Sequence, residues 1–176
     1  MKNRTSATRT PTVLFVCTGN ICRSPMAEGL LRTRLTREGL ADRIQVRSSG
    51  THGIDGSPAS TYAIVALHQM GIDIRGHRAR TVTQQAIDDA DLLLVMTHRH
   101  ITFIERHFRR TKGKLYLLNE MIGQDFDVDD PYGGPETEYA HCAHQLSNTV
   151  DQGLQTILGL LPSFTAASAS YPRIPR

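Results

Sequence analysis

The chain has 176 residues, of which 39% are hydrophobic and 21% are charged, which indicates one globular domain with an ordinary core. The net charge of +3 arises at the two ends, since residues 12–161 carry 15 basic and 17 acidic side chains, and this balance argues against a nucleic-acid-binding domain. Three cysteines are too few for a disulfide scaffold, and no apolar run approaches membrane-spanning length. We expect residues 1–11 to be a disordered tail, 12–161 the domain, and 162–176 a flexible tail.

Strand-like and helix-like segments alternate along the domain. We predict strands at 13–16, 43–48, 91–96 and 114–118, and helices at 26–38, 58–70, 83–90, 98–110 and 136–161. We expect Ser57 to cap the helix that begins at residue 58. The alternation predicts an α/β fold, a single-domain four-stranded parallel sheet with helices on both faces. Functional sites in such folds gather at the carboxyl ends of the strands.

The first strand leads into a loop and a helix that together form a candidate anion site. Gly19 and Asn20 favour a turn, while Ser24 suits a helix N-cap and Pro25 the first helical position. Such a loop points backbone N–H groups at a bound anion, and Arg23 adds a planar fork of donors for phosphate oxygens. Cys17 stands at the start of this loop, where a positive field favours the nucleophilic thiolate. The stretch therefore predicts a phosphate-binding loop after strand one, with a nucleophile for phosphoryl transfer.

The segment Cys-Thr-Gly-Asn-Ile-Cys-Arg-Ser-Pro at 17–25 resembles the phosphate loop of the low-molecular-weight protein tyrosine phosphatases. The resemblance extends over residues 12–161 and is strongest to a bacterial branch that also contains protein arginine phosphatases. It implies a phosphatase that acts on phosphorylated proteins without a metal or other cofactor. In the implied mechanism Cys17 forms a cysteinyl-phosphate while Arg23 clamps the phosphoryl oxygens. The implied phosphate-binding residues are Thr18, Gly19, Asn20, Ile21, Cys22, Arg23 and Ser24.

The resemblance also assigns the general acid. Four aspartates crowd the segment before Pro131, and the family's acid is the aspartate that directly precedes proline and an aromatic residue. That position is Asp130, which implies that Asp130 protonates the leaving oxygen and then activates water. Asp129 is the rival, since it lies next to Asp130 and could share its titration.

Three supporting roles follow from the same resemblance. Ser24 is expected to hydrogen-bond the Cys17 sulfur, and Asn20 to brace the loop from a left-handed conformation. His77 is expected to pack beneath the loop and bond the asparagine. Tyr132 is expected to form one wall of the entrance, where a substrate ring can stack.

Two further cysteines and the loop's isoleucine have implied roles. Cys22 is expected to bridge Cys17 reversibly under oxidation, whereas Cys142 is expected to be structural. Arginine phosphatases of the family carry threonine at the position of Ile21, so Ile21 favours phosphotyrosine over phosphoarginine. The segment 49–53 lacks the aromatic residue that often lines the family's cleft, so we expect an open wall there.

Several other functions are weighed against the phosphatase. Arsenate reductases share the loop but need two more cysteines, which are absent between Cys22 and Cys142. A metal-binding or redox-sensing module could use His98, His100 and the His141–His144 cluster, but we interpret these histidines as solvated helix faces. No Gly-Lys-Ser/Thr motif supports a nucleotide-binding loop. Because a working thiolate needs a reducing compartment, we expect a cytoplasmic protein. We also expect a monomer or weak dimer, with no membrane or nucleic-acid partner.

Overall fold

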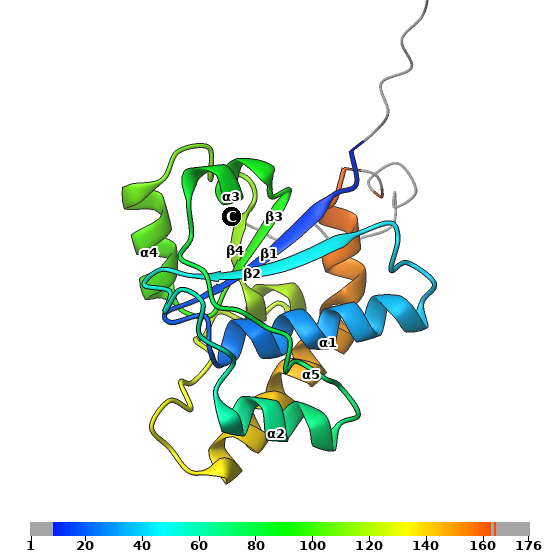
Figure 1. Cartoon of the computed structure of the whole chain (residues 1–176). Coiled ribbons are helices and arrows are strands. Elements are labelled where there is room, and N and C mark those ends of the chain that lie inside the picture. Colours follow the sequence, from blue (N-terminus) through cyan, green and yellow to red (C-terminus); the bar gives the residue numbers. More distant parts are fainter. Residues whose placement is uncertain (1–8, 163, 165–176) are drawn as a thin grey trace, which may run out of the picture.

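The computed structural model describes residues 9–162 and 164 and has helices on both faces of a parallel sheet (Figure 1). The strands are β1 (Thr12–Cys17), β2 (Gln45–Gly50), β3 (Leu92–Val95) and β4 (Leu115–Leu117). The helices are α1 (Arg23–Arg37), α2 (Thr61–Gln69), α3 (Gln84–Asp89), α4 (His98–His107), the short 3₁₀ helix η1 (Leu118–Ile122) and α5 (Glu136–Leu160). The predicted fold class is therefore confirmed.

The sheet has the order β2-β1-β3-β4, and all its pairings are parallel. Every residue of β1 is buried because β1 lies in the interior of the sheet, between β2 and β3, and is covered on both faces. Phe15 packs into a core with α1, α2 and α5, whereas Leu14 and Val16 pack into a second core with α3 and α4. This two-sided burial gives the strand that ends at Cys17 a rigid position.

Two helix starts differ from those predicted. Helix α1 begins at Arg23 after Cys22, so Ser24 is its second residue and not its N-cap, and Pro25 is its third residue. Proline is still tolerated there, since the N–H groups of the first turn have no partner within the helix. Helix α2 begins at Thr61 after Ser60, so the expectation that Ser57 caps it was wrong.

The predicted tails lie mostly outside the described residues. Within the described part, Arg9 pairs with Asp91 at 2.8 Å, and the Arg43 guanidinium lies 4.7 Å above the Phe164 ring. No helix in the described ranges is long and apolar enough to cross a membrane.

Candidate active site

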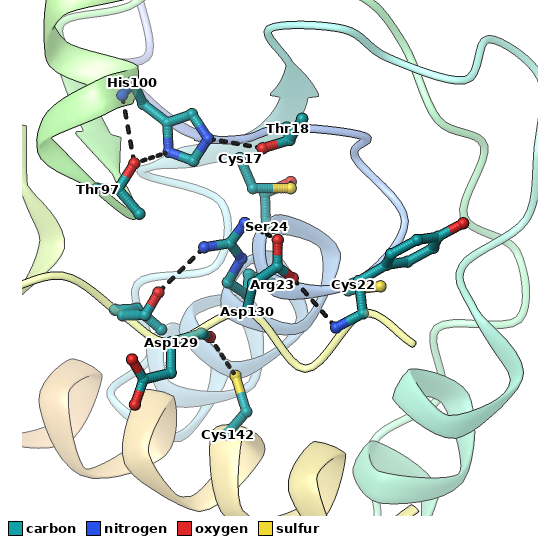
Figure 2. Close-up of polar contacts among 12 residues, drawn as sticks. Cys17, Thr18, Cys22, Arg23, Ser24, Thr97, His100, Asp129, Asp130 and Cys142 are labelled. Carbon is teal, nitrogen blue, oxygen red and sulfur yellow. Dashed lines mark hydrogen bonds and ion pairs between the residues drawn. The ribbon is translucent and has the colours of Figure 1, made fainter. Parts of the chain in front are cut away.

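Cys17 is the last residue of β1, at the carboxyl edge of the sheet, and its side chain lies over the start of α1 (Figure 2). The residue is 2% exposed, and its Sγ lies 3.0 Å from Ser24 Oγ. Asn20 Nδ2 donates to the same Ser24 hydroxyl oxygen at 2.9 Å. Because Ser24 accepts from Asn20, its single hydroxyl hydrogen can be donated either to the sulfur or to the Ser49 carbonyl, 3.4 Å away. The geometry suits a donor that stabilises a thiolate.

Asn20 holds the loop between β1 and α1 in shape. It is fully buried and has a φ of 56°, in the left-handed region that asparagine tolerates. Its Nδ2 also donates to Ser48 Oγ at 2.9 Å, and its Oδ1 accepts from the Arg80 N–H at 2.9 Å. The His77 ring donates from Nε2 to the Asn20 carbonyl at 2.7 Å. The structure thus brings together Asn20, Ser24 and His77, and adds Ser48 and Arg80.

Arg23 is 3% exposed and reaches across to the loop that contains the aspartates. One terminal nitrogen donates to the Val128 carbonyl at 3.0 Å, and the other donates to Asp130 Oδ2 at 2.5 Å (Figure 2). The buried Nε has no hydrogen-bond partner among the described residues. Since buried donors are normally paired, this guanidinium has unused capacity for an anion.

The structure separates the two candidate acids. Asp130 lines a cavity of about 260 Å³ together with Cys17 and Arg23, and its Oδ1 accepts from the Tyr132 N–H at 3.2 Å. Asp129 does not line this cavity; it lines a neighbouring hollow of about 270 Å³ against α5. There its carbonyl faces the Cys142 sulfur at 4.0 Å. Of the two carboxylates, only Asp130 shares the hollow of the nucleophile.

The mouth of the same cavity is lined mainly by apolar side chains. Ile21 and Tyr132 line it, and Tyr132 is 68% exposed. At the segment 49–53, where an open wall was expected, His52 lines the cavity, and Ile54 lines it just beyond. The His52 ring leans on Phe103 of α4, with ring centroids 5.1 Å apart. The His52 side of the cavity is therefore supported from α4.

His100 is a site residue that the sequence analysis misplaced on a solvated face. It is 5% exposed, and its two ring nitrogens lie 3.0 Å from the hydroxyls of Thr18 and Thr97 (Figure 2). Burial, together with the positive charge of Arg23, lowers the pKa of His100 to about 4. The ring is neutral near pH 7 and ties α4 to the phosphate loop. The sequence signal that could have located His100 is Thr97, because an N-cap threonine lies within hydrogen-bond reach of the residue three positions later.

The other two cysteines are buried free thiols. Cys22 Sγ lies 3.4 Å from Ser60 Oγ and 3.4 Å from the Tyr139 hydroxyl, and burial raises the pKa of its thiol. Burial also raises the pKa of Cys142 to about 12. Both side chains are therefore protonated near pH 7, which leaves Cys17 as the candidate nucleophile.

The histidines weighed as metal ligands do not assemble into a site. Within the described ranges, no three His, Cys, Asp or Glu side chains are arranged to hold a metal ion. His98 instead contacts two aspartates, Asp125 and Asp127.

The chain is similar to known proteins over most of its length. The family model described as "Low molecular weight phosphotyrosine protein phosphatase" matches residues 12–158. A protein-arginine-phosphatase of Bacillus subtilis is 38% identical over 141 residues, which cover 80% of this chain and 92% of that protein. A probable low molecular weight protein-tyrosine-phosphatase of Ralstonia solanacearum is 36% identical over 149 residues, 85% of this chain and 97% of that protein. The structure of a low molecular weight protein tyrosine phosphatase from T. tengcongensis superposes with a TM-score of 0.79 at 36% identity, covering 83% of this chain and 99% of that one.

Proposed function

The chain belongs to the low molecular weight phosphotyrosine protein phosphatase family, a family of hydrolases, and on that premise we propose that it dephosphorylates proteins through a cysteinyl-phosphate on Cys17. The observation that carries the proposal is the shared cavity of Cys17, Arg23 and Asp130. A nucleophile, an anion clamp and a proton donor in one small hollow are the parts that phosphomonoester hydrolysis requires.

In the first step the Cys17 thiolate attacks phosphorus in line with the leaving oxygen. The sulfur–phosphorus bond forms as the phosphorus–oxygen bond breaks, and protonated Asp130 gives its proton to the departing oxygen. The equatorial oxygens are held by the loop N–H groups and by Arg23, where the charge of the transition state is spread.

Arg23 has to exchange partners for this step. Its guanidinium donates to Asp130 and to Val128, with Nε unpaired among the described residues. A phosphoryl group in the loop competes with Asp130 for the same donors, since phosphate offers more acceptor oxygens. This exchange releases the Asp130 carboxyl from the ion pair and frees it to face the leaving oxygen.

In the second step the roles reverse. Asp130, now a carboxylate, accepts a proton from water as that water attacks the phosphorus. The phosphorus–oxygen bond forms, the Cys17 sulfur departs as thiolate, and inorganic phosphate leaves. Ser24, 3.0 Å from the sulfur, stabilises the thiolate at both ends of the cycle.

Because the nucleophile and two other cysteines are free thiols, we propose that the enzyme works in a reducing compartment, the cytoplasm.

Phosphotyrosine is the substrate that the cavity supports best. Ile21, Ile54 and Tyr132 surround the mouth, so a flat aryl ring meets apolar neighbours there. A phosphoarginine has Asp130 as an anionic partner, but each of its guanidinium N–H groups left unpaired against Ile21 costs roughly 1–3 kcal/mol. Phosphoarginine is the second candidate, because the Bacillus subtilis relative is named for that activity.

Kinetics on matched phosphotyrosine and phosphoarginine peptides test the proposal. Wild type should prefer phosphotyrosine, and Ile21→Thr should shift the ratio of kcat/KM values toward phosphoarginine by about tenfold or more. The matched control is Ile54→Thr at the same mouth, which should weaken aryl turnover without gain on phosphoarginine. Equal ratios in wild type and Ile21→Thr would show that Ile21 does not select the substrate. Cys17→Ser with more than about a hundredth of wild-type turnover would overturn the mechanism itself.

A further inference from the structure

The first turn of α4 contacts both halves of the active site. On one side, His100 bonds Thr18 of the phosphate loop at 3.0 Å. On the other side lies the acid loop, residues 124–135, which carries Asp130. The Val128 N–H donates to the Met96 carbonyl at 2.8 Å, and the His98 N–H donates to Asp127 Oδ1 at 2.8 Å. The turn is therefore placed to set the acid loop relative to the nucleophile.

The His98 side chain adds two more contacts to the acid loop. Its Nδ1 lies 2.7 Å from Asp127 Oδ1, and its Nε2 lies 2.8 Å from Asp125 Oδ1. Ionised carboxylates only accept hydrogen bonds, so both ring nitrogens must donate, and only the protonated imidazolium can do this. One charged ring thus bridges two positions of the acid loop.

These contacts end shortly before the general acid. Asn119 holds the Phe126 carbonyl at 2.8 Å, and Arg23 holds the Val128 carbonyl at 3.0 Å. Residues 125–128 are therefore fixed at successive points, and Asp130 follows two residues later. A loosened anchor at 125 and 127 would widen the range of positions that the Asp130 carboxylate samples over the cavity.

We propose that His98 is a positioning residue, which bridges Asp125 and Asp127 so that Asp130 meets the leaving oxygen. The inference rests on the proposed function and names a part of the site that the phosphate-loop resemblance does not include. His98 does not line the cavity of Cys17, so its role is exerted through the acid loop and not through the substrate.

The bridge depends on pH in a defined direction. The charged groups that face the His98 ring are the carboxylates of Asp127 and Asp125, and their hydrogen bonds raise the pKa of His98 above its usual 6.5. His100, on the same turn, faces Thr18 and is neutral near pH 7. The bridge is therefore complete below the raised pKa of His98 and is lost as the pH rises through it.

The test compares two aryl phosphates, because a misplaced acid harms poor leaving groups most. In the full chain, His98→Ala should lower kcat/KM for phenyl phosphate by about three- to tenfold, the scale of an exposed ion-pair bridge. It should lower kcat/KM for 2,4-dinitrophenyl phosphate by less than about twofold. Asp127→Asn should give the same pattern. The ratio of the phenyl phosphate rate to the 2,4-dinitrophenyl phosphate rate should fall more steeply with rising pH in wild type than in His98→Ala.

The matched control is Arg99→Ala, which removes a positive charge one residue away on the same exposed turn. It should leave the ratio of the two rates unchanged. The inference is overturned if His98→Ala leaves the ratio unchanged, lowers both rates equally, or is matched by Arg99→Ala. The proposed function is tested separately: it stands if wild type is active and Cys17→Ser is inactive, whatever His98→Ala does. An inactive wild type would refute the proposed function itself.

Discussion

Replacing Gly50 by alanine should displace the phosphate loop without touching a catalytic side chain. Gly50 ends β2 and pairs with Cys17 across the sheet. A Cβ on Gly50 would lie 2.4 Å from the Thr18 carbonyl oxygen and 2.9 Å from the Asn20 nitrogen. Both atoms belong to the backbone of the loop, so no side-chain rotation relieves the overlap.

The size of the displacement follows from these distances. Real Cβ atoms stay at least 3.0 Å from such neighbours, so the Thr18 carbonyl has to retreat by at least about 0.6 Å. The strand cannot yield instead, because Gly50 is held on its outer edge by hydrogen bonds to Arg80 and Val82, both 2.8 Å. A displacement near 1 Å in a catalytic constellation costs on the order of 10²-fold in rate, so we expect kcat/KM for an aryl phosphate to fall about 10- to 100-fold.

The measurement is steady-state turnover of an aryl phosphate, with thermal unfolding of the same samples to show that the fold persists. Gly76→Ala is the matched control, since nothing lies within 4 Å of a Cβ at that position. It should keep wild-type activity. A folded Gly50→Ala enzyme with more than about half of wild-type kcat/KM would refute the reasoning, as would an equal loss in Gly76→Ala.

Two further outcomes test the chemistry. Asp130→Ala should slow turnover of phenyl phosphate by roughly 10²–10⁴-fold and should strengthen competitive inhibition by phosphate, because Arg23 loses a rival partner; a larger loss of turnover in Asp129→Ala would reverse the assignment of the acid. Peroxide should inactivate the enzyme in a way that thiols reverse, through a bridge between Cys17 and Cys22 that mass spectrometry detects, and Cys22→Ala should lose that recovery; a bridge absent from the oxidised wild type would contradict this.

The sequence was most informative where a function is carried by neighbouring residues. The phosphate loop, its strand and its helix occupy one unbroken stretch, so the turn propensity of Gly19 and Asn20 and the guanidinium of Arg23 could be interpreted locally. The alternation of strands and helices likewise predicted the fold class, because parallel strands require crossover helices.

The errors arose where residues far apart in the sequence determine the burial or the hydrogen bonds of a side chain. Ser24 has the chemistry of an N-cap, but in the folded chain its hydroxyl accepts from Asn20 and lies against the Cys17 sulfur. His100 shares a helix turn with exposed residues, and only the packing of α4 against the phosphate loop buries it. The wall formed by His52 depends on Phe103, which lies far away along the sequence. Local propensity carries no record of such contacts.

The cavity is built from two kinds of structure, and this division bears on how its selectivity can change. Its floor belongs to β1 and the start of α1, where Cys17 and Arg23 are buried and any change would disturb the core. Its edge belongs to loops, where Ile54 is 48% exposed and Tyr132 is 68% exposed. Substitutions on exposed loops usually alter stability little. The scaffold can therefore evolve toward a new phosphorylated side chain by exchanging edge residues, while the phosphate chemistry beneath them stays the same.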